Sequence, residues 1–139
     1  MKTFDFGYGA VPAHRHINPD KGIGGWVADT AQVSDNACVF GNARVSGNAQ
    51  VSGNARVSGN ARVSGDAGVT YDPICISGLY WSITITDNHM RIGCEIHLKT
   101  EWNNFDDERI NRMDKRALEF WNQYKDILLP LCDRSKQIA

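Results

Sequence analysis

The sequence predicts a mainly β protein in which a short parallel β-solenoid is followed by a β-hairpin and a C-terminal helix or helix pair. Three observations predict this order. A six-residue repeat fills the middle of the 139-residue chain, a segment of alternating apolar and polar residues follows it, and apolar residues at helical spacing occupy the last third. We therefore divide the chain into an N-terminal cap or loop segment (1–24), the solenoid (25–74) and a C-terminal part (75–139).

The repeat is clearest in residues 41–65, which read GNARVSGNAQVSGNARVSGNARVSG. Val recurs every six residues from Val27 to Val69, and Ala recurs likewise from Ala31 to Ala67. A helix would need apolar residues three or four positions apart, whereas a period of six is typical of a β-solenoid with three hexads per coil. Strand alternation turns Ala and Val inward, and Gly-Asn makes the corners because both residues tolerate left-handed backbone angles.

The hexad Val-Ser-Gly-Asn-Ala-Arg resembles the hexapeptide repeat of left-handed parallel β-helices, best known from trimeric acyltransferases. The resemblance covers residues 25–74 and implies a left-handed coil and a homotrimer, neither of which follows from the spacing. Such a short stack has two unpaired strand edges. We expect residues 1–24 to cap one edge and the segment after Val69 to cap the other.

Residues 18 positions apart should stack on one face of the solenoid. Trp26, Arg44 and Arg62 then form an outward column. An aromatic ring with two guanidiniums could hold a phosphate or a base, or could simply be solvated near a subunit contact. The other columns are Gln32–Gln50–Gly68 and Cys38–Arg56. Phe40 should be exposed beside the third column, so we expect a partner subunit or the C-terminal part to cover it.

Residues 80–98 predict a β-hairpin whose turn lies at Asp87-Asn88. Ile83 then faces Ile92 and Ile85 faces Met90, and the second strand continues to Leu98. One face is apolar, with Trp81, Ile83, Ile85, Met90, Ile92, Cys94, Ile96 and Leu98. The other face is polar, with Ser82, Thr84, Thr86, His89, Arg91, Glu95 and His97.

Two groups of histidines are candidate sites. His89, Arg91 and His97 could form a small cationic site on the polar face, or merely a solvated surface. Cys94 and His97 have a zinc-like spacing, but alternation predicts them on opposite faces, so we expect no metal there. His14 and His16 lie in a segment that we interpret as a loop, where they could chelate a metal if the chain were extended, or simply face solvent.

Residues 103–132 predict helix. Asp106 is a good N-cap, a break near Asp114 could give two helices, and Pro130 should end or kink the last one. An apolar stripe should pack on the apolar face of the hairpin; it comprises Ile110, Met113, Ala117, Trp121, Tyr124 and Leu128.

The segments that flank the repeat are similar to those of short hexapeptide-repeat proteins of bacteriophages and prophages. They are AHRHINPDKGIGGWVADTA (13–31), GLYWSITITDNHMRIGCEIH (78–97) and EWNNFDDERINRMD (101–114). That group has no settled activity, so the resemblance implies no catalytic residues. Small phage proteins of this kind are often stoichiometric inhibitors of host defence. By this analogy we expect a non-enzymatic accessory binding protein, anti-CRISPR-like or sequestering a nucleotide signal, whose partner is a host protein or a small nucleotide.

We expect a cytoplasmic protein, and the phage resemblance implies the cytoplasm of a bacterial host. The net charge is −1, so we expect no bulk nucleic-acid binding, and any polyanion site must be a local patch. No apolar run reaches the roughly 20 residues that span a bilayer, and the N-terminus lacks the apolar segment of a secretory signal. The four scattered cysteines predict reduced thiols, and we expect no cofactor.

Two alternatives stay open. The first is an acyltransferase that uses acetyl-CoA, with His14, His16, His89 or His97 as general base. Against it, the coils are few, and residues 27–70 contain no inserted loop to carry a catalytic histidine, as those enzymes have. The second is a structural phage component, for which the chain is short.

Overall fold

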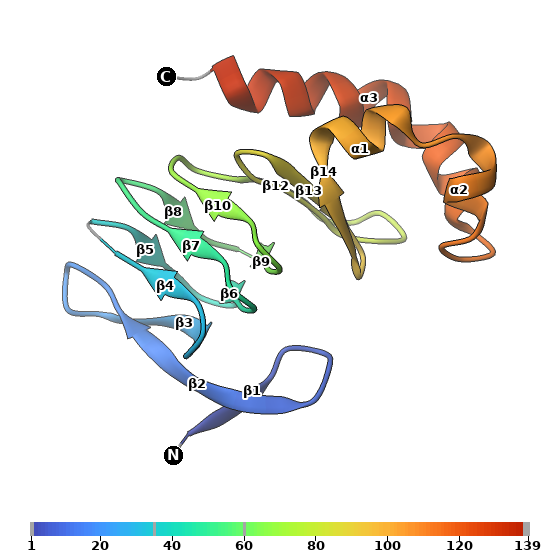
Figure 1. Cartoon of the computed structure of the whole chain (residues 1–139). Helices are drawn as coiled ribbons and strands as arrows, with labels where there is room; N and C mark the ends of the chain where they lie inside the picture. The colour runs from blue at the N-terminus through green and yellow to red at the C-terminus, as the bar shows by residue number, and fades with distance from the viewer. Residues whose placement is uncertain (1, 35, 60, 138–139) are drawn as a thin grey trace.

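The computed structural model describes residues 2–34, 36–59 and 61–137, with side chains described through Asp133. Figure 1 shows two N-terminal strands at one end, a stack of short strands in the middle, and a sheet covered by helices at the other end. The predicted class is confirmed, since short parallel sheets are followed by an antiparallel sheet and helices. Within the described part of the chain, no helix is long and apolar enough to cross a membrane.

The solenoid consists of strands that begin every six residues. They are β3 (Ile23–Ala28), β4 (Gln32–Val33), β5 (Cys38–Val39), β6 (Arg44–Val45), β7 (Gln50–Val51), β8 (Arg56–Val57), β9 (Arg62–Val63) and β10 (Gly68–Val69). Every third strand pairs in parallel, giving the columns β3–β6–β9, β4–β7–β10 and β5–β8. The predicted 18-residue stacking is confirmed. Val and Ala of the repeat fill the core, where Val39, Val45, Val51 and Val57 are 0% exposed. Phe40, which we expected to be exposed, is half-buried.

Glycine is required at two kinds of position. The corner glycines have left-handed angles, as predicted, with φ of 58° at Gly41 and 63° at Gly47. The asparagines that follow them do not, because among the described residues Lys21 is the only non-glycine with a positive φ. Gly24 and Gly25 are required for space. A Cβ on Gly24 would lie 1.9 Å from the Val39 carbonyl oxygen, and one on Gly25 would lie 2.2 Å from that of Ala43.

The first strand edges are capped by the N-terminal segment. β1 (Thr3–Asp5) and β2 (Ala10–Ile17) form an antiparallel pair, and β2 pairs with β3. The side chain of Asn18 covers β5: Nδ2 donates to the Val39 carbonyl at 3.0 Å, and Oδ1 accepts from the Val39 N–H at 2.8 Å. The buried amide thus replaces the missing neighbouring strand.

Side chains also cap the last edges. Asp72 Oδ1 accepts from the Arg56 N–H at 2.8 Å. The Asp87 carboxylate accepts from the Thr70 N–H at 3.1 Å. Thr84 Oγ1 accepts from the Arg62 N–H at 3.1 Å. The backbone groups left open by the last coil are therefore satisfied by the segment that follows it.

The C-terminal sheet has the strand order β11 (Ile74–Ile76), β12 (Ile83–Ile85), β13 (His89–Ile92) and β14 (Glu95–Leu98). The predicted register of β12 and β13 is confirmed, with Ile83 facing Ile92 and Ile85 facing Met90. The single strand predicted through Leu98 is wrong, because the chain turns at Gly93-Cys94 and β14 folds back along β13. Gly93 has a φ of 58°, which makes this turn possible.

The turn reverses which way the residues of β14 face. Met90 faces His97, and Arg91 faces Ile96. Ile96 therefore packs against the solenoid core, whereas His97 lies on the helix side of the sheet among aromatic rings. Our assignment of Ile96 to the apolar helix-facing side and of His97 to the polar side is thus wrong.

The helical segments are α1 (Lys99–Asn104), α2 (Asp107–Asn111) and α3 (Ala117–Gln137). The predicted cap and break are confirmed, since Asp106 Oδ1 accepts from the Arg109 N–H at 2.8 Å and the chain is not helical around Asp114. Pro130 lies inside α3 and does not end it. The predicted stripe joins the residues of β12 and β13 in one core.

Candidate functional site

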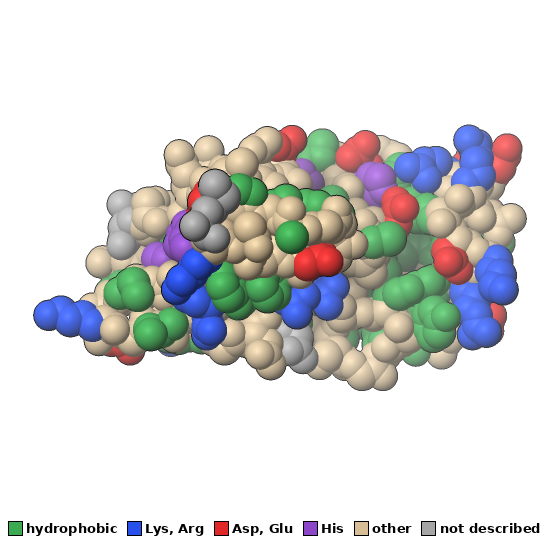
Figure 2. Space-filling view, turned by 90° about the horizontal axis from the view of Figure 1, so that it is seen from below, with side chains coloured by type: hydrophobic (Ala, Val, Ile, Leu, Met, Phe, Trp, Pro, Cys, Tyr) green, Lys and Arg blue, Asp and Glu red, His purple; other side chains and the backbone are tan. Residues whose placement is uncertain are grey.

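Four arginines gather on one side of the solenoid. Trp26, Arg44 and Arg62 are in register along β3, β6 and β9, as predicted. Arg15 of β2 pairs with Trp26. Arg91 of β13 donates from Nη1 to Ser64 Oγ at 2.6 Å, two residues beyond Arg62. We call Arg15, Arg44, Arg62 and Arg91, together with Trp26 and Phe4, the arginine face. Figure 2 shows Lys and Arg side chains beside hydrophobic ones on the lower side of the molecule.

The aromatic rings of this face are already engaged. Arg15 Cζ lies 5.6 Å from the centre of the Trp26 ring, which stacks on Phe4 at 4.9 Å. Arg44 Cζ lies 5.1 Å from the centre of the Phe4 ring. The rings hold the guanidiniums in place by cation–π attraction. A ligand would therefore contact the guanidinium N–H groups of this face more than its aromatic rings.

The positive charge of the arginine face is poorly neutralised. Among the described residues, none of its four arginines forms an ion pair with a carboxylate. Backbone carbonyls accept from two of them, Gly24 from Arg15 and Gly93 from Arg91, both at 2.7 Å. Burial and the nearby charge of Arg62 lower the pKa of Arg91.

Two adjoining hollows open on the face. One is lined by Asn42, Arg44, Arg62, Ser77 and Ser82 and has a volume of about 490 Å³. The other is lined by Phe4, Arg15, Trp26, Asn42 and Arg44, with two small neighbours. The first is within the roughly 300–1,000 Å³ of small-molecule sites. No carboxylate is among the residues that line either hollow, and the Asp5 carboxylate of β1 acts on Arg44 from outside them. Guanidinium, amide and hydroxyl donors of this kind suit an anion.

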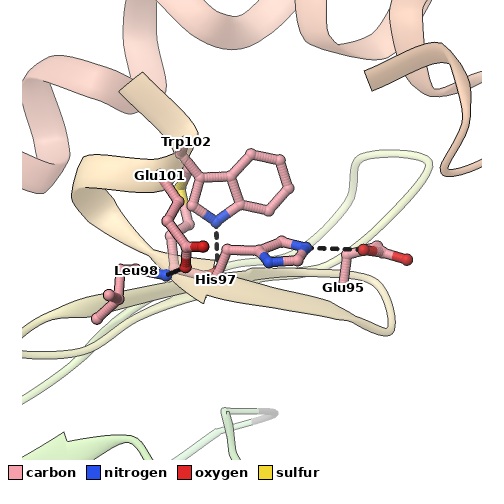
Figure 3. Close-up of polar contacts among 6 residues, drawn as sticks. Glu95, His97, Leu98, Glu101 and Trp102 are labelled. Carbon is pink, nitrogen blue, oxygen red and sulfur yellow. Dashed lines mark hydrogen bonds and ion pairs between the residues drawn. The ribbon is translucent and has the colours of Figure 1, made fainter. Parts of the chain in front are cut away.

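His89, Arg91 and His97 do not form the cationic site that we considered. His97 lies on the other side of the sheet, with Nε2 2.8 Å from Glu95 Oε1. The ring of His97 packs edge-on against Trp102 and Phe105. Figure 3 shows the indole of Trp102 above the His97–Glu95 pair. The expectation of a shared polar face is wrong, because it rested on one continuous strand.

His14 and His16 lie in strand β2, not in the expected loop. His14 Nδ1 lies 2.8 Å from Asp29 Oδ1. Burial lowers the pKa of His16. Within residues 2–34, 36–59 and 61–137, no three His, Cys, Asp or Glu side chains are grouped to hold a metal. Cys94 lies in the exposed turn, so strand alternation was not a valid argument about a zinc site there.

Sequence reasoning missed Arg15 and Phe4. Both come from the N-terminal segment, which we interpreted as a cap or loop. The signal was present in residues 18–22, NPDKG, which are turn formers between two short runs that can pair. Recognising that hairpin would have placed Arg15 opposite Trp26.

Residues 31–71 match the model of the YdcK beta-solenoid repeat family in four overlapping segments, 31–47, 39–53, 49–65 and 55–71. The match covers less than a third of the chain and concerns the repeat alone. It agrees with the stacked coils of the structure. Neither a curated protein nor a solved structure shows significant similarity to this chain.

Proposed function

We propose that the chain is a non-enzymatic binding protein that holds a phosphate-bearing ligand on the arginine face. The observation that carries this proposal is the pair Arg44 and Arg62, one coil apart and without a carboxylate partner among the described residues. Neighbouring strands lie about 4.8 Å apart, so two guanidiniums can grip one phosphate or two linked ones. Arg56 occupies the same hexad position on another face, where Asp72 neutralises it at 3.0 Å.

We further propose that this ligand is a nucleotide signal of bacterial defence, which a phage accessory protein would sequester. The resemblance of the flanking segments to phage and prophage proteins supports this role. The size of the hollow beside Arg44 and Arg62 favours a nucleotide over a protein surface. The proposal includes a homotrimer, as the hexapeptide resemblance implies, and light scattering of the purified protein measures that state.

Calorimetry tests the anion site. We expect adenosine triphosphate to bind and adenosine not to bind, because the guanidinium N–H groups of the site would donate hydrogen bonds to phosphate oxygens. Arg44→Gln combined with Arg62→Gln should weaken binding at least about tenfold, since hydrogen bonds to charged groups contribute about 1.5–3 kcal/mol each. Arg56→Gln is the matched control and should bind like the wild type. Equal binding of adenosine and its triphosphate would refute the site.

The biological role needs a separate measurement. The tagged protein, captured from bacteria with active defence, should retain a small phosphorylated compound that mass spectrometry identifies. The double arginine variant should lose it. A capture that carries no such compound, together with normal calorimetry, would reject the defence role and leave the anion site standing.

A further inference from the structure

We propose that the C-terminal part holds a second site, a small aromatic pocket that takes an alkylammonium group. The pocket lies on the helix side of the sheet, where Trp81, Trp102, Phe120 and Trp121 line it and Glu95 and Asp114 add carboxylates. We call it the aromatic pocket. It shares no residue with the arginine face and does not rest on the function proposed above.

The walls of the aromatic pocket pack closely against one another. Trp102 is 2% exposed, and its Nε1 donates to the Met90 carbonyl at 2.7 Å. Trp102 also packs against Trp121 at 5.3 Å, and Trp81 packs edge-on against Phe120 at 5.2 Å. Rings that are fixed by their neighbours need no reordering when a ligand enters.

The charges around the pocket select a cation. Glu95 comes from β14, and its Oε1 lies 2.8 Å from His97 Nε2, which orients the carboxylate (Figure 3). Asp114 comes from the turn before α3, and its Oδ1 accepts from the Arg116 N–H at 2.8 Å. Aromatic faces attract cations through the ring quadrupole, and two carboxylates add to that attraction. An anion would be repelled, and a neutral ligand would lack the charge–charge attraction to the carboxylates.

The volume of the aromatic pocket and the positions of the nearby arginines limit which ligands can bind there. The volume is about 80 Å³. That is far below the roughly 300–1,000 Å³ of sites that enclose a whole small molecule, so the pocket can take a small head group such as a methylated ammonium but not a nucleotide. The nearby guanidiniums of Arg109 and Arg116 lie on Phe105 and Tyr80, rings outside the pocket. Within the described chain, no Lys or Arg lies over a ring of the pocket itself.

The test compares choline with 3,3-dimethylbutan-1-ol, its neutral isostere, by NMR of the indole N–H signals of the full chain. We expect choline at millimolar concentration to shift the signals of Trp81 and Trp121 but not that of Trp26. The isostere should bind at least about tenfold more weakly, because it lacks the charge. Equal shifts with both compounds, or none with choline at tens of millimolar, would overturn the proposal.

A charge-neutral variant supplies the second arm. Glu95→Gln with Asp114→Asn keeps hydrogen-bond acceptors for His97 and for the Arg116 N–H, so the fold should persist, as an unchanged spectrum elsewhere would show. The preference for choline should then fall to near equality with the isostere. If the preference stayed at its wild-type value, the carboxylates would not form the site. Anion binding at the arginine face should be unchanged.

Discussion

Gly24 and Gly25 show how single residues decide whether the chain can enter the solenoid. Their backbone lies directly against the carbonyls of Val39 and Ala43, with no room for a side chain. The repeat glycines have a different task, because they supply left-handed corners. Glycine is thus required at the two kinds of position for different physical reasons: close approach of the backbone at Gly24 and Gly25, and left-handed backbone conformation at the corners.

Gly24→Ala should lower the free energy of unfolding by at least about 2 kcal/mol, because the new methyl overlaps the Val39 carbonyl and the coils must separate. Denaturant unfolding followed by circular dichroism measures this. Gly68→Ala is the matched control, since a Cβ there meets nothing within 4 Å. Equal stability of the two variants would contradict the close approach.

His89 links stability to pH. Burial lowers its pKa from 6.5; Asp66 and Glu101 oppose the shift, and His97 and Lys99 add to it. Its buried Nδ1 has no hydrogen-bond partner among the described residues. The folded chain therefore binds the proton less readily than the unfolded chain, and the stability present above pH 6.5 is lost as the pH falls below that value.

We expect His89→Gln to flatten the pH dependence of the unfolding free energy over the range in which the histidines titrate. Burial also lowers the pKa of His16, so this residue should retain part of the slope. Unfolding curves at several pH values between neutral and mildly acidic measure the effect. An unchanged slope in the variant would contradict a buried, neutral His89.

At the scale of elements, the open edges of the coils are closed by side chains as much as by strands. Asn18, Asp72, Asp87 and Thr84 each bond to a backbone group that the next coil would otherwise engage. A short solenoid can therefore end without an exposed edge that would recruit other chains.

Asn18→Ala should destabilise the fold by about 2–4 kcal/mol, because it leaves the buried N–H and carbonyl of Val39 unpaired. Asn48→Ala, in an exposed turn, should stay within about 0.5 kcal/mol of the wild type. Chemical denaturation compares the two. If Asn18→Ala matched Asn48→Ala, the cap would contribute little.

The strands and helices could be predicted from the sequence wherever a single local pattern determines them. The hexad register follows from periodicity, and the pairing of Ile83 with Ile92 follows from alternation together with the turn residues Asp87-Asn88. The turn at Gly93-Cys94 was missed because apolar alternation continued across it, so nothing in the pattern distinguished one long strand from two short ones. Pro130 lies inside α3 and does not end it, so a single proline was not enough to place the end of the helix.

At the scale of the whole molecule, the candidate site combines solenoid residues with residues from the segments that precede and follow the solenoid. β2 supplies Arg15, the solenoid supplies Arg44 and Arg62, and β13 supplies Arg91 (Figure 1). The central column was predictable, because stacking follows from the repeat. Its neighbours were not, since their positions depend on how the flanking strands pair, which a single sequence leaves open.

The most direct test of the account is to locate anion binding with arginine Nε–H signals in NMR during a titration with inorganic pyrophosphate. We predict that the signals of Arg44 and Arg62 shift together and saturate. Those of Arg56 and Arg112, which are paired with Asp72 and Glu108, should not move. Shifts of similar size at all arginines, or none at Arg44 and Arg62, would contradict an anion site on the arginine face.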